Sequence, residues 1–152
     1  MNHQNYSGHR IKVLHVLTNQ RMGQIVAALD LTPAQAVLLH FFTQNPGARS
    51  RDAEAYLSLT HPTVCGILSR LEEKGFLRTQ PDSQDRRCKR SFPTPQGLNA
   101  QADVERGIQA VEEQLVTGFS PEEREIFSDL LQRAIQNLGG ADAIRNWEEP
   151  KA

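Results

Sequence analysis

Residues 60–97 have the sequence THPTVCGILSRLEEKGFLRTQPDSQDRRCKRSFPTPQG, and they decide the fold of this chain. A polar cap and a periodic apolar pattern predict a helix over residues 61–74, which Gly75 ends. Residues 76–80 are typical of a strand, and the charged, turn-rich residues 81–90 predict a hairpin. Thr94-Pro95-Gln96-Gly97 then begins another helix. The stretch therefore predicts a helix followed directly by a basic β-ribbon.

Two longer helices are predicted upstream of this stretch. Apolar residues recur every three to four positions over about residues 9–29, which is the pattern of an amphipathic helix. Thr32, Pro33 and Gln35 have the spacing of an N-cap, a first-turn proline and a capping box. They predict the start of a second helix, which Asn45-Pro46-Gly47 ends.

A third, short helix is predicted immediately before residue 60. Residues 48–50 are a candidate strand, and Ser50 is expected to cap a helix over residues 51–57. Only about three residues then separate this helix from the one over residues 61–74. Two short helices joined so closely have the spacing of a helix-turn-helix.

The remainder of the chain is also predicted to be helical. Residues 95–116 have one apolar side, Gly118 interrupts the pattern, and Ser120-Pro121-Glu122-Glu123 is a further capping box before a helix that ends at Gly139-Gly140. The predicted fold is mainly α with a small β-wing, which is a winged helix-turn-helix.

Charge is distributed unevenly along the chain. The net charge is −1, so the total gives no support for nucleic-acid binding. Residues 49–90, however, hold nine Lys and Arg against six Asp and Glu, whereas the flanking segments are acidic. Apolar residues make up 38% of the chain, which is lean for a helical protein and favours subunits that share a core. No apolar run approaches the roughly 20 residues of a membrane helix, so we expect a cytoplasmic protein with no membrane partner.

The helix over residues 61–74 would be about 21 Å long, and the major groove, about 12 Å wide, admits one helix. Its apolar residues are expected to face the core: Val64, Ile67, Leu68 and Leu71. The opposite face is small and polar, and we take its residues as candidate DNA contacts: His61, Thr63, Gly66, Ser69 and Arg70. An ordinary solvated helix surface would have similar residues, so the helix alone does not decide the function.

The hairpin strengthens the DNA-binding interpretation. Four basic residues lie at its tip and on its return strand, where they could reach phosphates or the minor groove: Arg86, Arg87, Lys89 and Arg90. Asp82 and Asp85 are expected to pair with some of these arginines and to shape the wing.

Four segments together resemble the MarR family of bacterial transcriptional regulators: Leu31-Thr32-Pro33-Ala34-Gln35, Leu68-Ser69-Arg70-Leu71-Glu72-Glu73-Lys74-Gly75-Phe76, Asp85-Arg86-Arg87 and Thr94-Pro95-Gln96-Gly97. The resemblance extends over about residues 9–140. It implies a homodimer, formed through the N- and C-terminal helices, that binds a pseudo-palindromic operator in double-stranded DNA, usually as a repressor. It also implies that Asp85 braces the wing and that Arg86 or Arg87 reaches DNA.

On this basis the chain divides into a dimerisation helix (residues 1–30), the winged helix-turn-helix domain (31–95), dimerisation helices (96–140) and a flexible tail (141–152). The return strand departs from the family pattern, because Ser91 and Pro93 stand where apolar residues are usual. Since proline has no N–H to donate to a ladder, we expect strand pairing to end by Phe92.

Other functions have weaker support in the sequence. The family resemblance implies that a small aromatic effector could bind between the DNA-binding part and the dimer helices, but no residue pattern identifies such a compound. Cys65 and Cys88 form no disulfide or metal framework, and a thiol-based redox regulator is one alternative. A winged-helix module that binds an acidic protein is another. The five histidines do not have ligand spacing, and no catalytic triad, carboxylate pair or phosphate loop stands out. We therefore expect no metal, no cofactor and no enzymatic activity.

Overall fold

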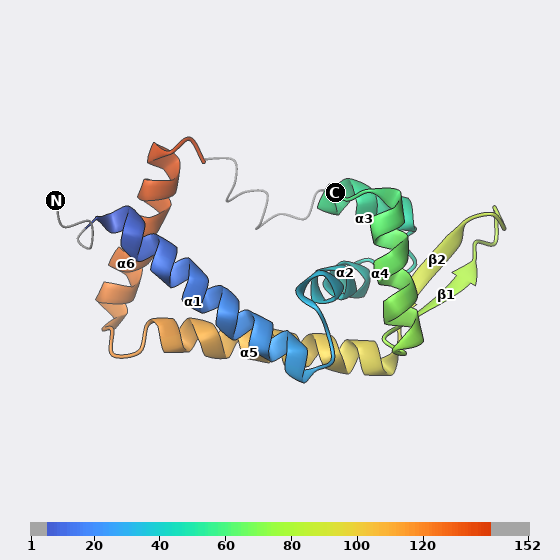
Figure 1. Cartoon of the computed structure of the whole chain (residues 1–152), viewed down its shortest axis with the longest axis horizontal. Coiled ribbons are helices and arrows are strands. Elements are labelled where there is room, and N and C mark those ends of the chain that lie inside the picture. Colours follow the sequence, from blue (N-terminus) through green and yellow to red (C-terminus); the bar gives the residue numbers. More distant parts are fainter. Residues whose placement is uncertain (1–5, 141–152) are drawn as a thin grey trace. The chain divides into compact units, whose positions relative to one another are not determined.

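A computed structural model of the chain describes residues 6–140, and it divides into two compact units, residues 1–111 and 112–152. The elements follow in the order α1 (Ser7–Ala28), α2 (Pro33–Gln44), α3 (Ser50–Leu57), α4 (His61–Glu73), β1 (Leu77–Pro81), β2 (Lys89–Pro93), α5 (Pro95–Leu115) and α6 (Pro121–Asn137) (Figure 1). The predicted fold class, mainly helical with a small two-stranded wing, is confirmed. The functional division of the chain stays a prediction, and the predicted tail, residues 141–152, lies outside the described residues.

Local capping interactions define where two of the helices begin. The Gln35 N–H donates to Thr32 Oγ1 (3.2 Å), and the Thr32 N–H donates to Gln35 Oε1 (3.1 Å), which completes the predicted capping box of α2. Ser120 and Glu123 form the same pair at the start of α6 in the second unit. The prediction that Ser50 caps α3 is wrong, because Arg49 occupies the cap and its N–H donates to the Asp52 carboxylate at 2.8 Å.

The core of the first unit forms around α2. Leu38, Leu39 and Phe42 are completely buried there, and Val64 and Leu71 of α4 join the same cluster. Buried apolar side chains on these two helices therefore fix α4 against α2, and the opposite face of α4 is left exposed.

The start of α5 packs closely against the entrance of the hairpin. A Cβ atom on Gly97 would overlap the Phe76 carbonyl oxygen, so only glycine allows the helix to approach the chain this closely. The Thr94 hydroxyl donates to the Gly75 carbonyl at 2.6 Å, and it accepts from the Gly97 N–H at 3.0 Å. The base of the wing is thereby tied to α5.

The two strands pair antiparallel along their whole length, from Leu77 opposite Pro93 to Pro81 opposite Lys89. The expectation that pairing ends by Phe92 is therefore wrong. The Thr94 N–H donates to the Phe76 carbonyl at 3.0 Å, and hydrogen-bonded pairs alternate with non-bonded ones along the ladder. Pro93 falls on a non-bonded pair, so its missing N–H removes no bond between the strands.

Ser91 also fits the sheet, because β2 bonds on both of its edges. The buried Ser91 donates its N–H to the Ala48 carbonyl (3.1 Å) and accepts from the Gly47 N–H (2.8 Å). A bridge between Arg49 and Arg90 continues this contact, so the candidate strand at residues 48–50 is reduced to this bridge, and Ser50 already belongs to α3.

Several apolar side chains of α1 and α6 are exposed, and they include Leu17, Ile126 and Leu130. In residues 6–140, no single helix is long and apolar enough to cross a membrane, and α1 and α2 meet that criterion only as a pair bent by 72°.

Candidate nucleic-acid interface

The helix α4 lies between α3 and the hairpin within the first unit (Figure 1). Ser58 takes a left-handed conformation (φ 53°) after α3, and Pro62 stands in the first turn of α4, where its missing N–H leaves no helical bond unmade. A tight turn thus joins the two helices. The five residues predicted to contact DNA all lie exposed on α4: His61, Thr63, Gly66, Ser69 and Arg70.

Most of these exposed residues have partners inside the protein. His61 Nδ1 lies 2.5 Å from Glu54 Oε1 of α3, and its Nε2 lies 3.4 Å from the Cys65 thiol. Arg70 pairs with Glu73 at 3.0 Å. Because the Glu73 carboxylate offsets the positive charge of Arg70, this face of α4 is polar and hydrogen-bonding rather than strongly positive.

The end of α4 is attached to the first strand of the hairpin. Glu72 Oε1 accepts from both the N–H (3.1 Å) and the hydroxyl (2.6 Å) of Thr79. A charged acceptor makes these bonds stronger than neutral ones. The wing and the candidate reading helix are therefore linked through side chains as well as through the backbone.

Positive charge is concentrated at the tip of the hairpin. Arg86, Arg87 and Lys89 are all exposed, and the Arg87 side chain has 96% of its surface accessible. Asp85 shapes the turn, because its carboxylate accepts from the Arg87 N–H (3.1 Å) and its carbonyl from the Cys88 N–H (2.9 Å). The basic side chains are thus displayed on an ordered turn.

Arg90 is placed differently from the other three predicted wing contacts. Its Nε donates to the buried Asp82 carboxylate (2.8 Å) and its guanidinium donates to the Gly47 carbonyl (2.9 Å). Arg49 donates to the same Asp82 oxygen at 2.6 Å. The Gln84 N–H and then the Arg49 guanidinium hold the pKa of Asp82 well below its usual range, and the bond to Asp82 raises the pKa of Arg49.

Arg49 and Arg78 also belong to this region, although the sequence does not single them out. Arg49 is 33 positions from Asp82, and no local pattern connects them. Arg78 of β1 is exposed, and its guanidinium lies 4.9 Å from the centre of the Phe92 ring. The alternation of side chains along a strand could have placed Arg78 on the outer face of the hairpin.

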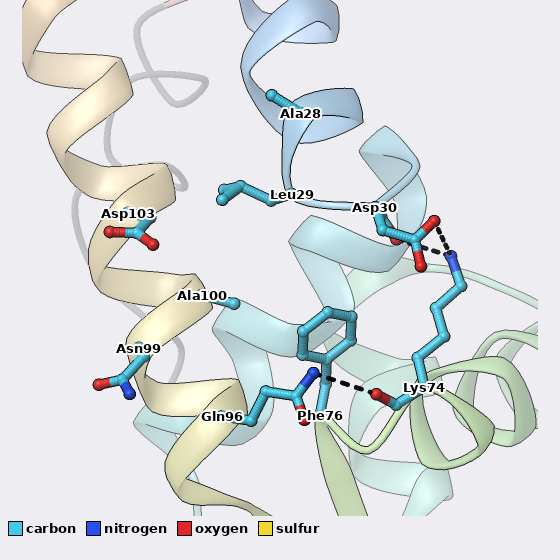
Figure 2. A pocket seen from close by; sticks show the side chains of 9 residues that line it. All are labelled: Ala28, Leu29, Asp30, Lys74, Phe76, Gln96, Asn99, Ala100 and Asp103. Carbon is cyan, nitrogen blue, oxygen red and sulfur yellow. Dashed lines mark hydrogen bonds and ion pairs between the residues drawn. The ribbon is translucent and has the colours of Figure 1, made fainter.

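A cavity of about 450 Å³ opens beside the C-terminal end of α4, and Figure 2 shows its lining. The residues around it come from the end of α1, the hairpin entrance and α5: Ala28, Leu29, Asp30, Lys74, Phe76, Gln96, Asn99, Ala100 and Asp103. Lys74 Nζ donates to the Asp30 carbonyl (2.6 Å) and lies 3.3 Å from its carboxylate. The cavity therefore has one aromatic ring, one paired ammonium group and polar side chains.

Cys65 and Cys88 are free, half-buried thiols. Across residues 6–140, the structure contains no group of three His, Cys, Asp or Glu side chains arranged to hold a metal ion.

The helix-turn-helix of α3 and α4, with the hairpin beside it, defines a winged helix-turn-helix protein. Residues 29–87 match the model of the MarR family. The uncharacterised HTH-type transcriptional regulator YybA of Bacillus subtilis (strain 168) is 31% identical over 123 residues, which cover 81% of this chain and 79% of YybA. The chain belongs to the MarR family of transcriptional regulators.

Solved structures agree with this assignment. A mutant of S. aureus MepR, bound to an oligodeoxyribonucleotide, is 26% identical with a TM-score of 0.72, and the match covers 89% of this chain and 99% of that one. MepR itself, a transcription regulator of the Staphylococcus aureus multidrug efflux pump MepA, has the same fold, with 24% identity, a TM-score of 0.78, and coverage of 88% and 98%.

Proposed function

We propose that this protein is a homodimeric repressor that binds a pseudo-palindromic operator in double-stranded DNA. The observation that carries the proposal is an exposed polar face on α4 next to a hairpin with an exposed basic tip, on neighbouring elements of one compact unit. The structure of a MepR mutant with an oligodeoxyribonucleotide gives independent support, because that protein shares this fold. In this proposal the protein has no enzymatic activity and acts in the cytoplasm.

The helix and the hairpin have different roles in this proposal. The polar side chains of α4, led by Thr63 and Ser69, contact base edges in the major groove, where hydroxyl groups serve as donors or acceptors. Arg86, Arg87 and Lys89 contact phosphates or the minor groove. The wing supplies most of the affinity and the helix supplies the sequence preference, because the helix face has little net charge.

A dimer is proposed from the exposed apolar surfaces of α1 and α6. Leu17 and Leu130 are each more than half exposed, which is costly for large apolar residues gathered on helix faces. Two copies related by a two-fold axis match two half-sites, one helical turn apart or a multiple of that distance. Light scattering after gel filtration should give twice the chain mass, and Leu130→Glu should shift the protein toward the monomer.

Fluorescence anisotropy tests the DNA-binding function directly. The full chain should bind a duplex from the region upstream of its own gene more tightly than a random duplex of equal length. The logarithm of the binding constant should fall linearly with the logarithm of the salt concentration. Equal affinity for both duplexes at every salt concentration would contradict the proposal. A stable acidic protein partner recovered without DNA would favour the protein-binding alternative.

The cavity beside Lys74 is the site that we propose for a small aromatic effector that releases the DNA. Phe76 offers a ring face, and the ammonium group and the amides of the lining fix polar substituents. Asn99 is exposed at the cavity wall, so Asn99→Trp should fill the space. That variant should keep its affinity for DNA and lose its response to any compound that releases the wild-type protein. A compound that still releases the Asn99→Trp variant from DNA acts at another site.

A further inference from the structure

We infer that Asp82 positions the wing for DNA binding, and that Arg49 and Arg90 act through Asp82 rather than as contacts to DNA. This inference rests on the proposed DNA-binding function and assigns a role within it. It changes the role of Arg90, which the sequence places among the DNA contacts, and it adds Arg49, which the sequence does not single out.

The geometry concentrates three donors on one carboxylate. Arg49 and Arg90 both donate to Oδ2 of Asp82, at 2.6 and 2.8 Å, and the Gln84 N–H donates to Oδ1 at 2.9 Å. The Asp82 side chain has no accessible surface, whereas the two arginines are partly exposed. A buried carboxylate needs several oriented donors, and here it receives them from separate parts of the fold.

Those donors belong to different elements. Arg49 is the N-cap residue of α3, Arg90 lies in β2, and Asp82 directly follows β1. The Asp82 N–H also donates to the Cys88 carbonyl at 2.9 Å, one position beyond the paired strands. The carboxylate therefore joins the start of the helix-turn-helix to both strands of the wing, near the end of the ladder that leads to the tip.

A second set of bonds supports the same connection along β2. Arg90 donates to the Gly47 carbonyl, and Ser91 bonds to Gly47 and Ala48 through its backbone. Together with Asp82, these contacts fix the hairpin against the segment that enters α3. A wing already fixed in the free protein loses less conformational freedom when its tip meets DNA.

Electrostatics alone predicts that removing the charge of Asp82 strengthens DNA binding. Asp82→Asn raises the charge of the wing by one unit, and added positive charge strengthens phosphate binding. If Asp82 is a positioning residue, the same substitution should weaken binding because the tip is no longer fixed. The sign of the change therefore separates the two roles.

The experiment compares Asp82→Asn with Gln84→Lys in the full chain by fluorescence anisotropy on the upstream duplex. Both substitutions add one unit of charge to the same turn, but the exposed Gln84 side chain can be replaced while its N–H still bonds to Asp82. Gln84→Lys should bind as tightly as the wild type or more tightly. Asp82→Asn should bind about tenfold more weakly, the scale of one missing bond to a charged group. Equal or tighter binding by Asp82→Asn would overturn the inference.

The salt dependence of DNA binding tests the roles of Arg49 and Arg90. Arg49→Gln and Arg90→Gln should weaken binding but keep the wild-type slope of log K against log salt, because every phosphate contact remains. Arg86→Gln should lower the magnitude of the slope by about 0.9, the value for one phosphate contact. A slope reduced by that amount in Arg49→Gln or Arg90→Gln would show a direct contact and overturn the assignment. These variants also carry the test if Asp82→Asn fails to fold.

Amide hydrogen exchange in the absence of DNA separates this inference from the proposed function. Asp82→Asn should exchange faster than the wild type and Gln84→Lys over residues 77–93. Unchanged exchange there would show that Asp82 does not fix the wing. A wild-type protein that fails to bind any duplex would instead contradict the DNA-binding proposal, and it would leave the exchange result standing.

Discussion

Glu54 of α3 and His61 of α4 meet across the turn of the helix-turn-helix, with Oε1 of the carboxylate 2.5 Å from Nδ1 of the ring. The Glu54 side chain is mostly buried, whereas 65% of the His61 side chain is exposed. Glu54 thus holds the His61 ring at the N-terminal tip of α4, the helix that we propose contacts base edges in DNA.

This pair predicts a role for Glu54 in sequence discrimination. Glu54→Ala should release the His61 ring and remove a negative charge, so binding to the operator should weaken relative to binding to random DNA. We expect the ratio of the two affinities to fall about five- to tenfold, the lower range for one base contact. Glu54→Gln keeps an acceptor for Nδ1 and should largely preserve the ratio. Anisotropy on both duplexes measures this ratio of affinities. An unchanged ratio in Glu54→Ala would show that His61 does not contact a base.

Arg86 and Arg87 should contribute to affinity without regard to sequence. Arg86→Ala and Arg87→Ala are each expected to weaken binding to operator and random duplex alike, because phosphates carry no sequence information. Each should lower the slope of log K against log salt by about 0.9. Titrations at four salt concentrations measure the slope, and a loss confined to the operator would contradict this role.

Thr63 and Ser69 should behave in the opposite way. Thr63→Ala and Ser69→Ala are each expected to cost about 1–3 kcal/mol on the operator, the scale of one base contact, and to leave random-duplex binding nearly unchanged. Binding to a library of operators with single base changes would show which position loses its preference. If these variants resembled the wing variants, the division of roles between helix and hairpin would be wrong.

Gly66 allows stability and binding to be separated. Apart from its chain neighbours and the backbone of its own helix turn, no atom of the described residues lies within 4 Å of a Cβ at this exposed position, so Gly66→Ala should stabilise the free protein by about 1 kcal/mol. If the backbone of α4 comes close to DNA, the same methyl group should weaken binding. Urea unfolding and anisotropy together measure the two effects.

The lowered pKa of Asp82 predicts how stability depends on acid. A carboxyl group whose pKa is lower in the folded than in the unfolded state stabilises the fold above its usual pKa of about 3.9. That contribution decreases as the pH falls below this value, because the carboxyl group of the unfolded chain takes up a proton there, and it is lost completely once the pH falls through the lower pKa of the folded state. The wild type should therefore unfold at higher urea than Asp82→Asn at pH 7, and the difference should shrink toward pH 3. If the difference stayed constant from pH 7 to pH 3, its cause would not be the titration of Asp82.

The elements that the sequence predicts correctly depend on residues close together in the chain. Thr32 and Gln35 are three positions apart, so their capping box can be recognised without any tertiary information. The Asp82 cluster depends on Arg49, 33 positions away, and on the way in which the strand pairs. The tolerance for Pro93 likewise depends on which side of the ladder its nitrogen faces, which composition does not reveal.

The double bonding of β2 has a consequence for how the length of the hairpin can vary. Residues 47–49 bond to one edge of β2 and β1 bonds to the other, so the paired part of the wing cannot slide or lengthen without breaking both sets of bonds. The turn beyond Asp82 and Cys88 is bonded only within itself, from Gln84 to Asp82 and from Arg87 and Cys88 to Asp85, and doubling the length of a loop costs only about 0.6 kcal/mol in closure entropy. Insertions between residues 84 and 85 should therefore be tolerated, because they leave these bonds in place, and they would change the distance that the basic tip can reach without disturbing the framework that carries it.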